Sequence, residues 1–367
     1  MIALIMGAGI SLVFTMATMP VFIRLLTKKQ YGQVVRDDGP TSHAVKSGTP
    51  TMGGVIIVLA VILSYFLTHG ILTLMGRATS GVTASGLLAL LLFAGMGLVG
   101  FLDDFIKIAK KRSLGLRAWE KIVLQAAVGI AFAVLALNFP NENGLTPAST
   151  AISFLRDTNI DLAFAGPLAG LILFVLWSNL IVTGTTNGVN LTDGLDGLAA
   201  GTSIMVFGAY TLIGIWQNNQ ACGLPGAGNV CYTVRDPMDL ALLGAILCGA
   251  LIGFLWWNAK PAKIFMGDTG SLAIGGAIAA FAILSRTQLL LVVLAGLFVM
   301  IALSVIIQVG FFKLSGGKRV FKMAPLQHHF ELSGWAEENV VVRFWILGGL
   351  FVAAGLGIFY SEWVVAL

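Results

Sequence analysis

The chain has 367 residues, of which 57% are hydrophobic and only 11% are charged, and its mean hydropathy is +0.91. Ordinary soluble domains carry about 25% charged residues. A soluble protein of this size could not bury so much apolar surface, so the composition excludes a soluble globular enzyme, a disordered chain and a nucleic-acid-binding protein. The net charge of +5 is small enough to follow from membrane topology. We predict a polytopic membrane protein.

Ten apolar stretches are long enough to cross a bilayer, which requires about 20 residues in a helix. The predicted spans cover residues 2–26, 53–75, 85–102, 120–137, 161–183, 197–216, 237–257, 270–285, 288–312 and 344–361. This pattern predicts an all-α fold in which residues 1–367 form a single integral-membrane domain.

The connections between these spans alternate in charge. One set of alternate connections consists of residues 24–52, 103–121, 184–196, 258–268 and 313–343. Together these five segments hold 18 of the 22 Lys and Arg residues. Lys and Arg gather on the cytoplasmic side of a membrane, so we predict that these connections are cytoplasmic and that both termini are extracytoplasmic. On the opposite side, Cys222 and Cys231 are equally compatible with a disulfide and with two free thiols.

Dense polar clusters beside glycines occur in the connections predicted to be cytoplasmic. We expect the active site to be built from the segments 27–52, 103–121, 184–196, 258–268 and 313–343. In the first segment, Lys46 and Thr51 could bind an anionic substrate, although a solvated basic loop would have the same composition.

Asp103 and Asp104 close the third apolar stretch. Carboxylates so close to hydrocarbon are costly and usually functional. If the helix continues, Lys107 lies four residues from Asp103 on the same face. The alternative is an interfacial cap with a neutralising lysine.

The segment NGVNLTDGLDGLAAG contains no Lys or Arg, and its polar residues recur every third position. One turn of helix would bring Asn187, Asn190 and Asp193 to one side, and Asp196 follows at the same spacing. Two carboxylates without a cationic neighbour in the sequence indicate a metal ion or a substrate donor. Asp268, between Gly267 and Thr269, is either a helix cap or a member of the same acidic site.

His328 and His329 lie in the segment KMAPLQHHFE and could bind metal or phosphate. Gln308, late in the ninth span, could contribute to the same face or make an interhelical hydrogen bond. The abundance of oxygen ligands favours Mg²⁺ over zinc. Carboxylates for Mg²⁺, cations for phosphate and a hydrocarbon boundary together indicate phosphoryl chemistry on a lipid.

Five motifs, GTPTMGG, DDxxK, NLTDGLDGLA, FMGDTGS and MAPLxHHFE, occur in this order. With them the chain resembles the polyprenyl-phosphate N-acetylhexosamine-1-phosphate transferases, from about residue 34 to residue 345. The resemblance implies ten transmembrane helices, both termini outside, a requirement for Mg²⁺, a homodimer and a place in the bacterial plasma membrane with the active site facing the cytoplasm.

Within this family the motifs are most similar to the branch that serves peptidoglycan synthesis. The resemblance therefore implies transfer of phospho-MurNAc-pentapeptide from UDP-MurNAc-pentapeptide to undecaprenyl phosphate, which yields lipid I and UMP. A sister transferase that moves GlcNAc-1-phosphate is the alternative enzyme. A transporter for an anionic solute is disfavoured, because transporter sites lie near the bilayer midplane and the polar clusters here lie at one face.

The resemblance also assigns roles to individual residues. It implies a catalytic set of Asp103, Asp104, Lys107, Asp193, His328 and His329. It implies a substrate-binding set of Lys46, Thr51, Lys121, Asn187, Asn190, Asp196, Asn258, Phe265 and Gln308, with Phe265 stacked on uracil and Asp196 near the uracil edge. It implies Asp268 and Asp193 as Mg²⁺ ligands. Where the family usually has three consecutive histidines, this chain has Gln327 first, which speaks against an obligatory acid–base role at that position.

Overall fold

The structure is a computed structural model that describes residues 1–29, 48–76, 81–110, 115–224 and 230–365. Lys46, predicted to bind substrate, lies outside these residues. The helices are α1 (Ile2–Lys28), α2 (Gly54–Leu74), α3 (Ala84–Ala109), α4 (Ala118–Ala136), α5 (Pro167–Thr192), α6 (Leu198–Asn219), α7 (Pro237–Asn258), α8 (Gly267–Leu284), α9 (Leu291–Leu294), α10 (Gly296–Leu314), α11 (Leu326–Glu331) and α12 (Glu337–Val365).

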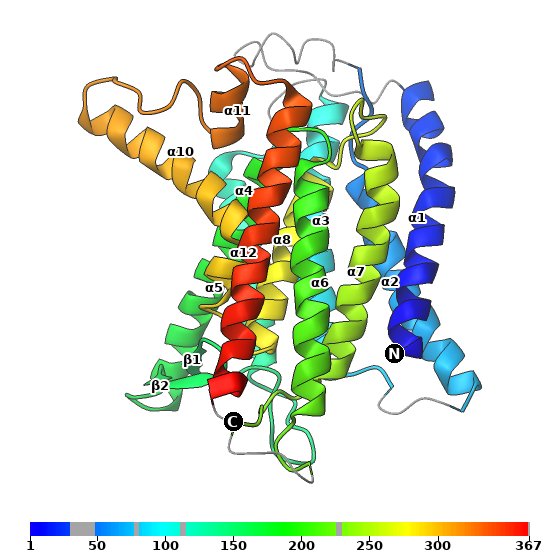
Figure 1. The fold of residues 1–367 in the computed structure, drawn as a ribbon, viewed down its shortest axis with the longest axis vertical. Helices are drawn as coiled ribbons and strands as arrows, with labels where there is room; N and C mark the ends of the chain where they lie inside the picture. Colours follow the sequence, from blue (N-terminus) through cyan, green and yellow to red (C-terminus); the bar gives the residue numbers. More distant parts are fainter. Residues whose placement is uncertain (30–47, 77–80, 111–114, 225–229, 366–367) are drawn as a thin grey trace.

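Among the described residues, ten helices are long and apolar enough to cross a membrane. They run side by side along the long axis of the molecule (Figure 1). The predicted all-α, ten-span fold is therefore confirmed. Both termini lie at the same end, opposite α11 (Figure 1), as an even number of crossings requires.

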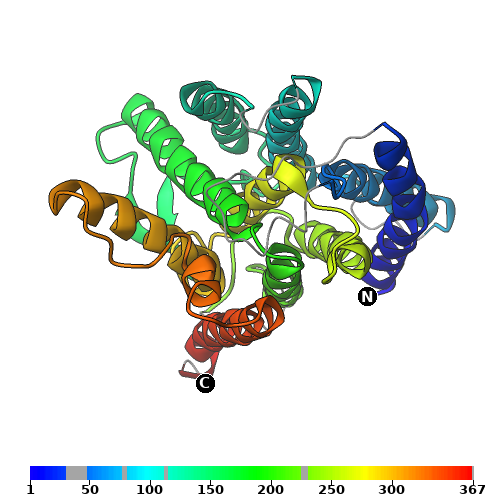
Figure 2. The same cartoon turned by 90° about the horizontal axis from the view of Figure 1, so that it is seen from above.

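Helix α8 is the centre of the bundle, and the other long helices surround it (Figure 2). Nearly all of α8 is buried, whereas only 22% of the apolar core of each of α4, α5, α10 and α12 is buried. The small residues of α8 explain its central position, because they allow the backbones of neighbouring helices to approach closely. A Cβ atom at Gly275 would collide with the backbone of Thr186 in α5, and one at Gly276 would press on Met96 in α3.

Helix α5 differs from the predicted span 161–183. It begins at Pro167, directly after Gly166 with φ of +104°, and a proline in the first turn is favourable because its missing N–H would be unpaired there. It continues to Thr192. Asn187 and Asn190 are therefore in the last turns of a helix, and the expected connection 184–196 begins only after residue 192.

The ninth predicted span, 288–312, is also different. It is broken at Ala295 into the single turn α9 and the long helix α10, which leans away from the bundle (Figure 1). At the break, the ring of Phe351 in α12 occupies the space where a Cβ of Gly296 would be. The apolar sequence gave no signal for this break.

The end of the molecule that carries the termini holds a small amount of β-structure that the sequence did not predict. Strands β1 (Ala151–Ser153) and β2 (Asp157–Asp161) form an antiparallel pair. In the connection between α6 and α7, Cys222 and Cys231 form a disulfide, which decides between the two alternatives left open above.

Candidate active site

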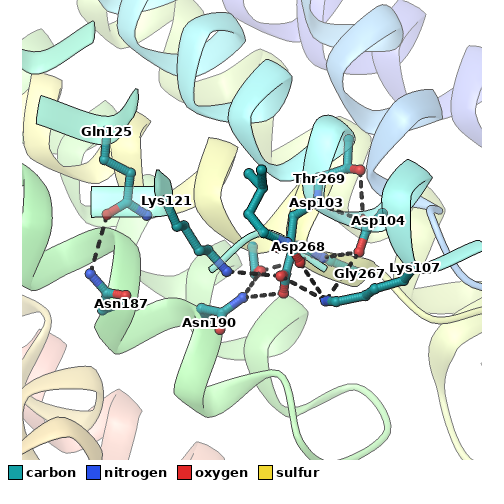
Figure 3. Close-up of polar contacts among 12 residues, drawn as sticks. Asp103, Asp104, Lys107, Lys121, Gln125, Asn187, Asn190, Gly267, Asp268 and Thr269 are labelled. Atoms are coloured by element: carbon teal, nitrogen blue, oxygen red, sulfur yellow. Dashed lines mark hydrogen bonds and ion pairs between the residues drawn. The ribbon is translucent and has the colours of Figure 1, made fainter. Parts of the chain in front are cut away.

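Three carboxylates converge where the end of α3 meets the start of α8. Asp103 and Asp104 are in the last two turns of α3, and Asp268 is in the first turn of α8. One oxygen from each of them lies within 4.8 Å of the others, and Asp103 and Asp104 are each only 3% exposed. Such an acidic triad could hold a metal ion (Figure 3).

Glycine brings these two helices together. A Cβ atom at Gly100, one turn before Asp104, would collide with the backbone carbonyl of Asp268. Gly54 of α2 packs in the same way against Gly270. The backbones of α2, α3 and α8 therefore approach as closely as only glycine allows, and this contact fixes the distance between the carboxylates.

Asp104 caps α8 from another helix. Its Oδ2 accepts hydrogen bonds from Thr269 N (2.9 Å) and Thr269 Oγ1 (2.7 Å), and its Oδ1 accepts one from Asp268 N (3.2 Å). The first amides of a helix need such an acceptor. Gly267 makes room for it, because its φ is +74° and a Cβ there would lie 2.6 Å from Asp104 Oδ2. Asp104 performs the capping role that was one alternative for Asp268.

Two lysines neutralise the triad. Lys107 Nζ lies 2.6 Å from Asp103 Oδ2, 2.9 Å from Asp268 Oδ2 and 3.7 Å from Asp104 Oδ1. Lys121 Nζ, from α4, lies 2.8 Å from the same oxygen of Asp268. The predicted placement of Lys107 and Asp103 on one helix face is confirmed.

Helix α5 adds amide groups from the opposite side. Asn190 Nδ2 donates to Asp268 Oδ1 (2.6 Å) and to Ser271 Oγ (2.9 Å), and Figure 3 shows Asn190 and Lys121 both pointing at Asp268. Asn187, one turn earlier, donates to the carbonyl of Thr183 and, at 3.5 Å, to Gln125 Oε1. Gln125 is fully buried in α4 and was not predicted, although a glutamine within an apolar span, one turn after Lys121, was a signal.

Asp193 ends α5 and is not a member of the acidic triad. Burial in the protein, followed by the nearby charges of Asp268, Asp104 and Asp196, raises the pKa of its carboxyl well above the ordinary value. A carboxylate in such surroundings is costly unless a cation is close.

Asp196 and Asn258 brace the connection between α7 and α8. Asp196 Oδ2 accepts from Ala262 N (3.1 Å), and Asn258 Nδ2 donates to the carbonyl of Ile264 (2.9 Å). Asn258 Oδ1 in turn accepts from Gly197 N (3.0 Å), at the turn before α6. These bonds hold the two connections together at the same end as the triad.

Phe265 joins this end to the start of α2. Its N–H donates to the carbonyl of Pro50 (2.8 Å), and its carbonyl accepts from Gly53 N (2.9 Å). Between these two residues lies Thr51, whose Oγ1 is 3.0 Å from the position of a Cβ on Gly267. Thr51 and Phe265 therefore lie beside the start of α8.

Helix α11 lies beside the turn that follows α5. His328 Nδ1 pairs with Glu331 Oε2 (2.7 Å), and the His328 ring lies against Gly194. Gln327 Nε2 donates to the carbonyl of Leu191 (2.8 Å), so this residue tethers α11 to α5 without any proton transfer. His329 Nδ1 accepts from the backbone N–H of Lys322 (3.1 Å).

Gln308 faces the loop that precedes α11. Its Oε1 accepts from Val320 N and Phe321 N, and its Nε2 donates to the carbonyl of Phe321. These bonds use both ends of the amide to shape the loop.

Asn187 pairs with Gln125 one turn before Asn190, and the other predicted residues that the structure describes fall into two groups at one end of the bundle. The directly contacting group is Asp103, Asp104, Lys107, Lys121, Asn190 and Asp268. The group in the surrounding turns and loops is Thr51, Asp193, Asp196, Asn258, Phe265, Gln308, His328 and His329. Anchored carboxylates beside lysines suit the binding of a cation together with phosphate groups.

Comparison with known proteins identifies a family for the chain. Residues 86–286 match the family model described as "Glycosyl transferase family 4", and residues 46–58 match the "Phospho-N-acetylmuramoyl-pentapeptide-transferase signature 1". The chain is similar over its full length to proteins named phospho-N-acetylmuramoyl-pentapeptide-transferase. It is 73% identical to the one from Paenarthrobacter aurescens and 57% to that from Beutenbergia cavernae, each covered completely, and 64% to that from Micrococcus luteus, of which 97% is covered.

Proposed function

The chain belongs to the phospho-N-acetylmuramoyl-pentapeptide-transferase family, and we propose that it transfers phospho-MurNAc-pentapeptide from UDP-MurNAc-pentapeptide to undecaprenyl phosphate. The products are lipid I and UMP, and the reaction is the first membrane step of peptidoglycan synthesis. The observation that carries the proposal is the cluster of two lysines and three carboxylates at the ends of membrane-spanning helices, within a chain that matches its relatives from end to end.

Mg²⁺ is the cofactor that we propose for this cluster. Hard oxygen ligands suit this ion, which usually takes one or two carboxylates together with substrate phosphates. Asp268 fits as a ligand, whereas Asp104 is committed to capping α8. Asp193 fits as an outer carboxylate, since its raised pKa reflects a site that needs positive charge. When bound, the ion would polarise the diphosphate and neutralise its charge.

The reaction needs little help from a strong base. The second pKa of a phosphate monoester is about 6, so the lipid phosphate is largely ionised at neutral pH. One of its oxygens attacks the sugar-proximal phosphorus, a new P–O bond forms, and UMP leaves with the electrons of the broken P–O bond. The main barrier is the repulsion between two anions, so electrostatic stabilisation is the largest contribution.

The residues of the cluster would share this task. Lys107 and Lys121, which pair with Asp268, would turn toward the phosphate oxygens as substrates enter. Asp103, which is held by Lys107 and by the backbone N–H of Leu116, would accept or steer a proton of the lipid phosphate. Phe265 and Asp196 would hold the uracil, while His328 and His329 would bind phosphate.

A direct assay tests the proposal. Purified protein is incubated with undecaprenyl phosphate and either UDP-MurNAc-pentapeptide or UDP-GlcNAc, with Mg²⁺ or with EDTA. We expect lipid I and UMP with the first donor only, and no product with EDTA. Turnover of UDP-GlcNAc instead would assign the chain to the sister activity. Release of UMP in the absence of undecaprenyl phosphate would identify a two-step route through a phospho-enzyme.

Orientation and assembly are part of the proposal. The excess of Lys and Arg in alternate connections supports a cytoplasmic active site, and accessibility of a cysteine introduced at Ser333 to a membrane-impermeant thiol reagent in inverted versus right-side-out vesicles tests it. A homodimer is proposed from the family alone, and native mass spectrometry of the protein in nanodiscs tests it.

A further inference from the structure

The last helix begins with a buried carboxylate to which the proposed reaction gives no role. Glu337 is in the first turn of α12, and its side chain is only 7% exposed. Burial of a carboxylate is costly unless hydrogen-bond donors or opposite charges satisfy it. The partners of Glu337 therefore indicate the role of this residue.

Glu337 bridges two segments that are far apart in the chain. Its Oε1 accepts a hydrogen bond from the backbone N–H of Asp196 (3.1 Å), in the turn between α5 and α6. Its Oε2 lies 3.2 Å from Lys260 Nζ, in the connection between α7 and α8. Hydrogen bonds to an ionised carboxylate are stronger than those between neutral groups, so one side chain ties the two segments to the start of α12.

The two bridged segments carry the two residues proposed to hold the uracil. Asp196 is in the first segment, and its own Oδ2 accepts from Ala262 N (3.1 Å) in the second. Phe265 follows three residues after Ala262. Asp196 is therefore anchored through its backbone by Glu337 and through its side chain by Ala262. A displacement of this turn would move the Asp196 carboxylate relative to the Phe265 ring.

The surroundings of this bridge are buried and largely apolar. Leu195 and Leu198, which flank Asp196 closely in the chain, belong to one buried cluster with Val340 of α12. Asp196 itself is only 5% exposed. A hydrogen bond is electrostatically stronger in such surroundings than in water, and removal of Glu337 would leave a backbone N–H without this acceptor, at a cost in free energy.

We propose that Glu337 is a positioning residue for the nucleotide of the donor substrate, and this inference rests on the proposed function. Glu337 acts through Asp196 on one side and through Lys260, in the segment that leads to Phe265, on the other. The two sides of the uracil site are then held at a fixed separation before the nucleotide binds. Such preorganisation strengthens binding, because less conformational entropy is lost when the ligand arrives.

The alternative role of Glu337 is to stabilise the start of α12, where an acidic side chain interacts favourably with the helix dipole. Glu338 separates the two roles. It is also in the first turn of α12 and also pairs with Lys260 (2.9 Å), but its side chain is 59% exposed. A role limited to the start of the helix would make the two glutamates equivalent.

Steady-state kinetics of Glu337→Ala test the proposal. We expect the KM for UDP-MurNAc-pentapeptide to rise about tenfold, which corresponds to the loss of one hydrogen bond to a charged group. The KM for undecaprenyl phosphate and kcat should stay within about twofold of wild type. Glu337→Gln keeps an oxygen for the N–H of Asp196 and should recover most of the loss. The matched control Glu338→Ala should change none of these constants.

Binding of UMP, measured by isothermal titration calorimetry, tests the inference without turnover. UMP contains the uracil but neither the sugar nor the peptide, so its Kd should rise about tenfold in Glu337→Ala and stay unchanged in Glu338→Ala. If Glu337→Ala does not fold, Lys260→Gln provides the test. It removes only the second contact of Glu337 and should raise the Kd about threefold.

Three results would overturn the proposal: an unchanged Kd for UMP in the folded variants, an equal rise in Glu338→Ala, or a fall in kcat at constant KM for the donor. Absence of both lipid I synthesis and UMP binding in the wild-type protein would instead refute the proposed function. A wild-type protein that binds UMP without making lipid I would leave the role of Glu337 to be decided by the calorimetry.

Discussion

The two ends of the bundle each bury a carboxylate, but they satisfy it in different ways. At the end that carries the termini, Asp239 of α7 accepts from Tyr65 and Thr83 (2.6 Å each) and lies 2.9 Å from His69 Nε2. All three partners come from neighbouring elements and can be uncharged, and among the described residues no lysine or arginine pairs with Asp239. The cluster closes on itself and joins α2, α3 and α7.

At the end that carries the acidic triad, several charged side chains lie close together. Asp268 meets two lysines and lies beside two further carboxylates. Like charges at such distances weaken a fold unless a ligand uses them. A buried carboxylate within a membrane protein therefore indicates a functional site when other carboxylates lie beside it and lysine side chains pair with it. It indicates a structural role when its hydrogen-bond partners are neutral donors.

The largest effect is expected for Asp268→Asn. This change removes the charge that holds Lys107, Lys121 and the proposed Mg²⁺, and loss of one such electrostatic group commonly lowers kcat by about 10²–10³-fold. Lipid I formation per folded protein is the measurement. The thermal midpoint serves as the control, and it should change little, because the variant also relieves repulsion among the carboxylates.

Asp239→Asn should lower the stability of the protein and leave its activity nearly unchanged. The variant leaves part of a buried hydrogen-bond group unpaired, so we expect the free energy of unfolding to fall by about 1–3 kcal/mol. Activity per folded molecule should remain near that of wild type, because Asp239 is at the other end of the bundle. A loss of activity comparable to that of Asp268→Asn, in protein that is still folded, would remove the distinction between the two ends.

Asp104→Asn should lower both stability and kcat, each by an intermediate amount. An asparagine has only one acceptor atom to offer to α8, and the loss of a helix cap costs about 1 kcal/mol. Because the cap fixes the position of Asp268, we also expect kcat to fall about tenfold. Thr269→Val is the matched comparison, since it removes only the hydroxyl donor to Asp104 and should reproduce the loss of stability more than the loss of activity.

Asp193→Asn should change the stability of the protein by the smallest amount, and the change should depend on pH. Burial raises the pKa of Asp193 in the folded protein, so the ionised carboxylate disfavours folding as pH rises above the unfolded value of about 3.9. Thermal midpoints in EDTA should show a gain in the variant that is absent near pH 4 and grows with pH. Asp161 is the control, because hydrogen bonds from Ala163 N and Thr150 lower its pKa. Asp161→Asn should therefore lose stability at the higher pH values.

The sequence predicted what depends on local spacing and hydropathy. Ten apolar stretches were enough for the fold class, and the four-residue spacing placed Lys107 beside Asp103. The end of α5 was misplaced, because Asn187 and Asn190 look like loop residues until Gln125 and Asp268 are seen to bind them. Their partial burial is a property of the packed helices rather than of the segment.

Other features required contacts that a single sequence does not display. From the sequence, Asp268 was a candidate for the cap of α8, and only the glycine contact between α3 and α8 gives that role to Asp104. The break at Ala295 falls within an uninterrupted apolar run, so hydropathy could not reveal it. The disulfide was undecided, because two cysteines nine residues apart can lie near each other in either redox state.

The most direct test of the difference between the two ends is the binding of a divalent cation, measured by electron paramagnetic resonance with Mn²⁺ in place of Mg²⁺. We predict that wild type and Asp239→Asn bind Mn²⁺ equally in the presence of UDP-MurNAc-pentapeptide, and that Asp268→Asn loses this binding. Unchanged Mn²⁺ binding in folded Asp268→Asn would contradict the assignment of the acidic triad as the catalytic centre.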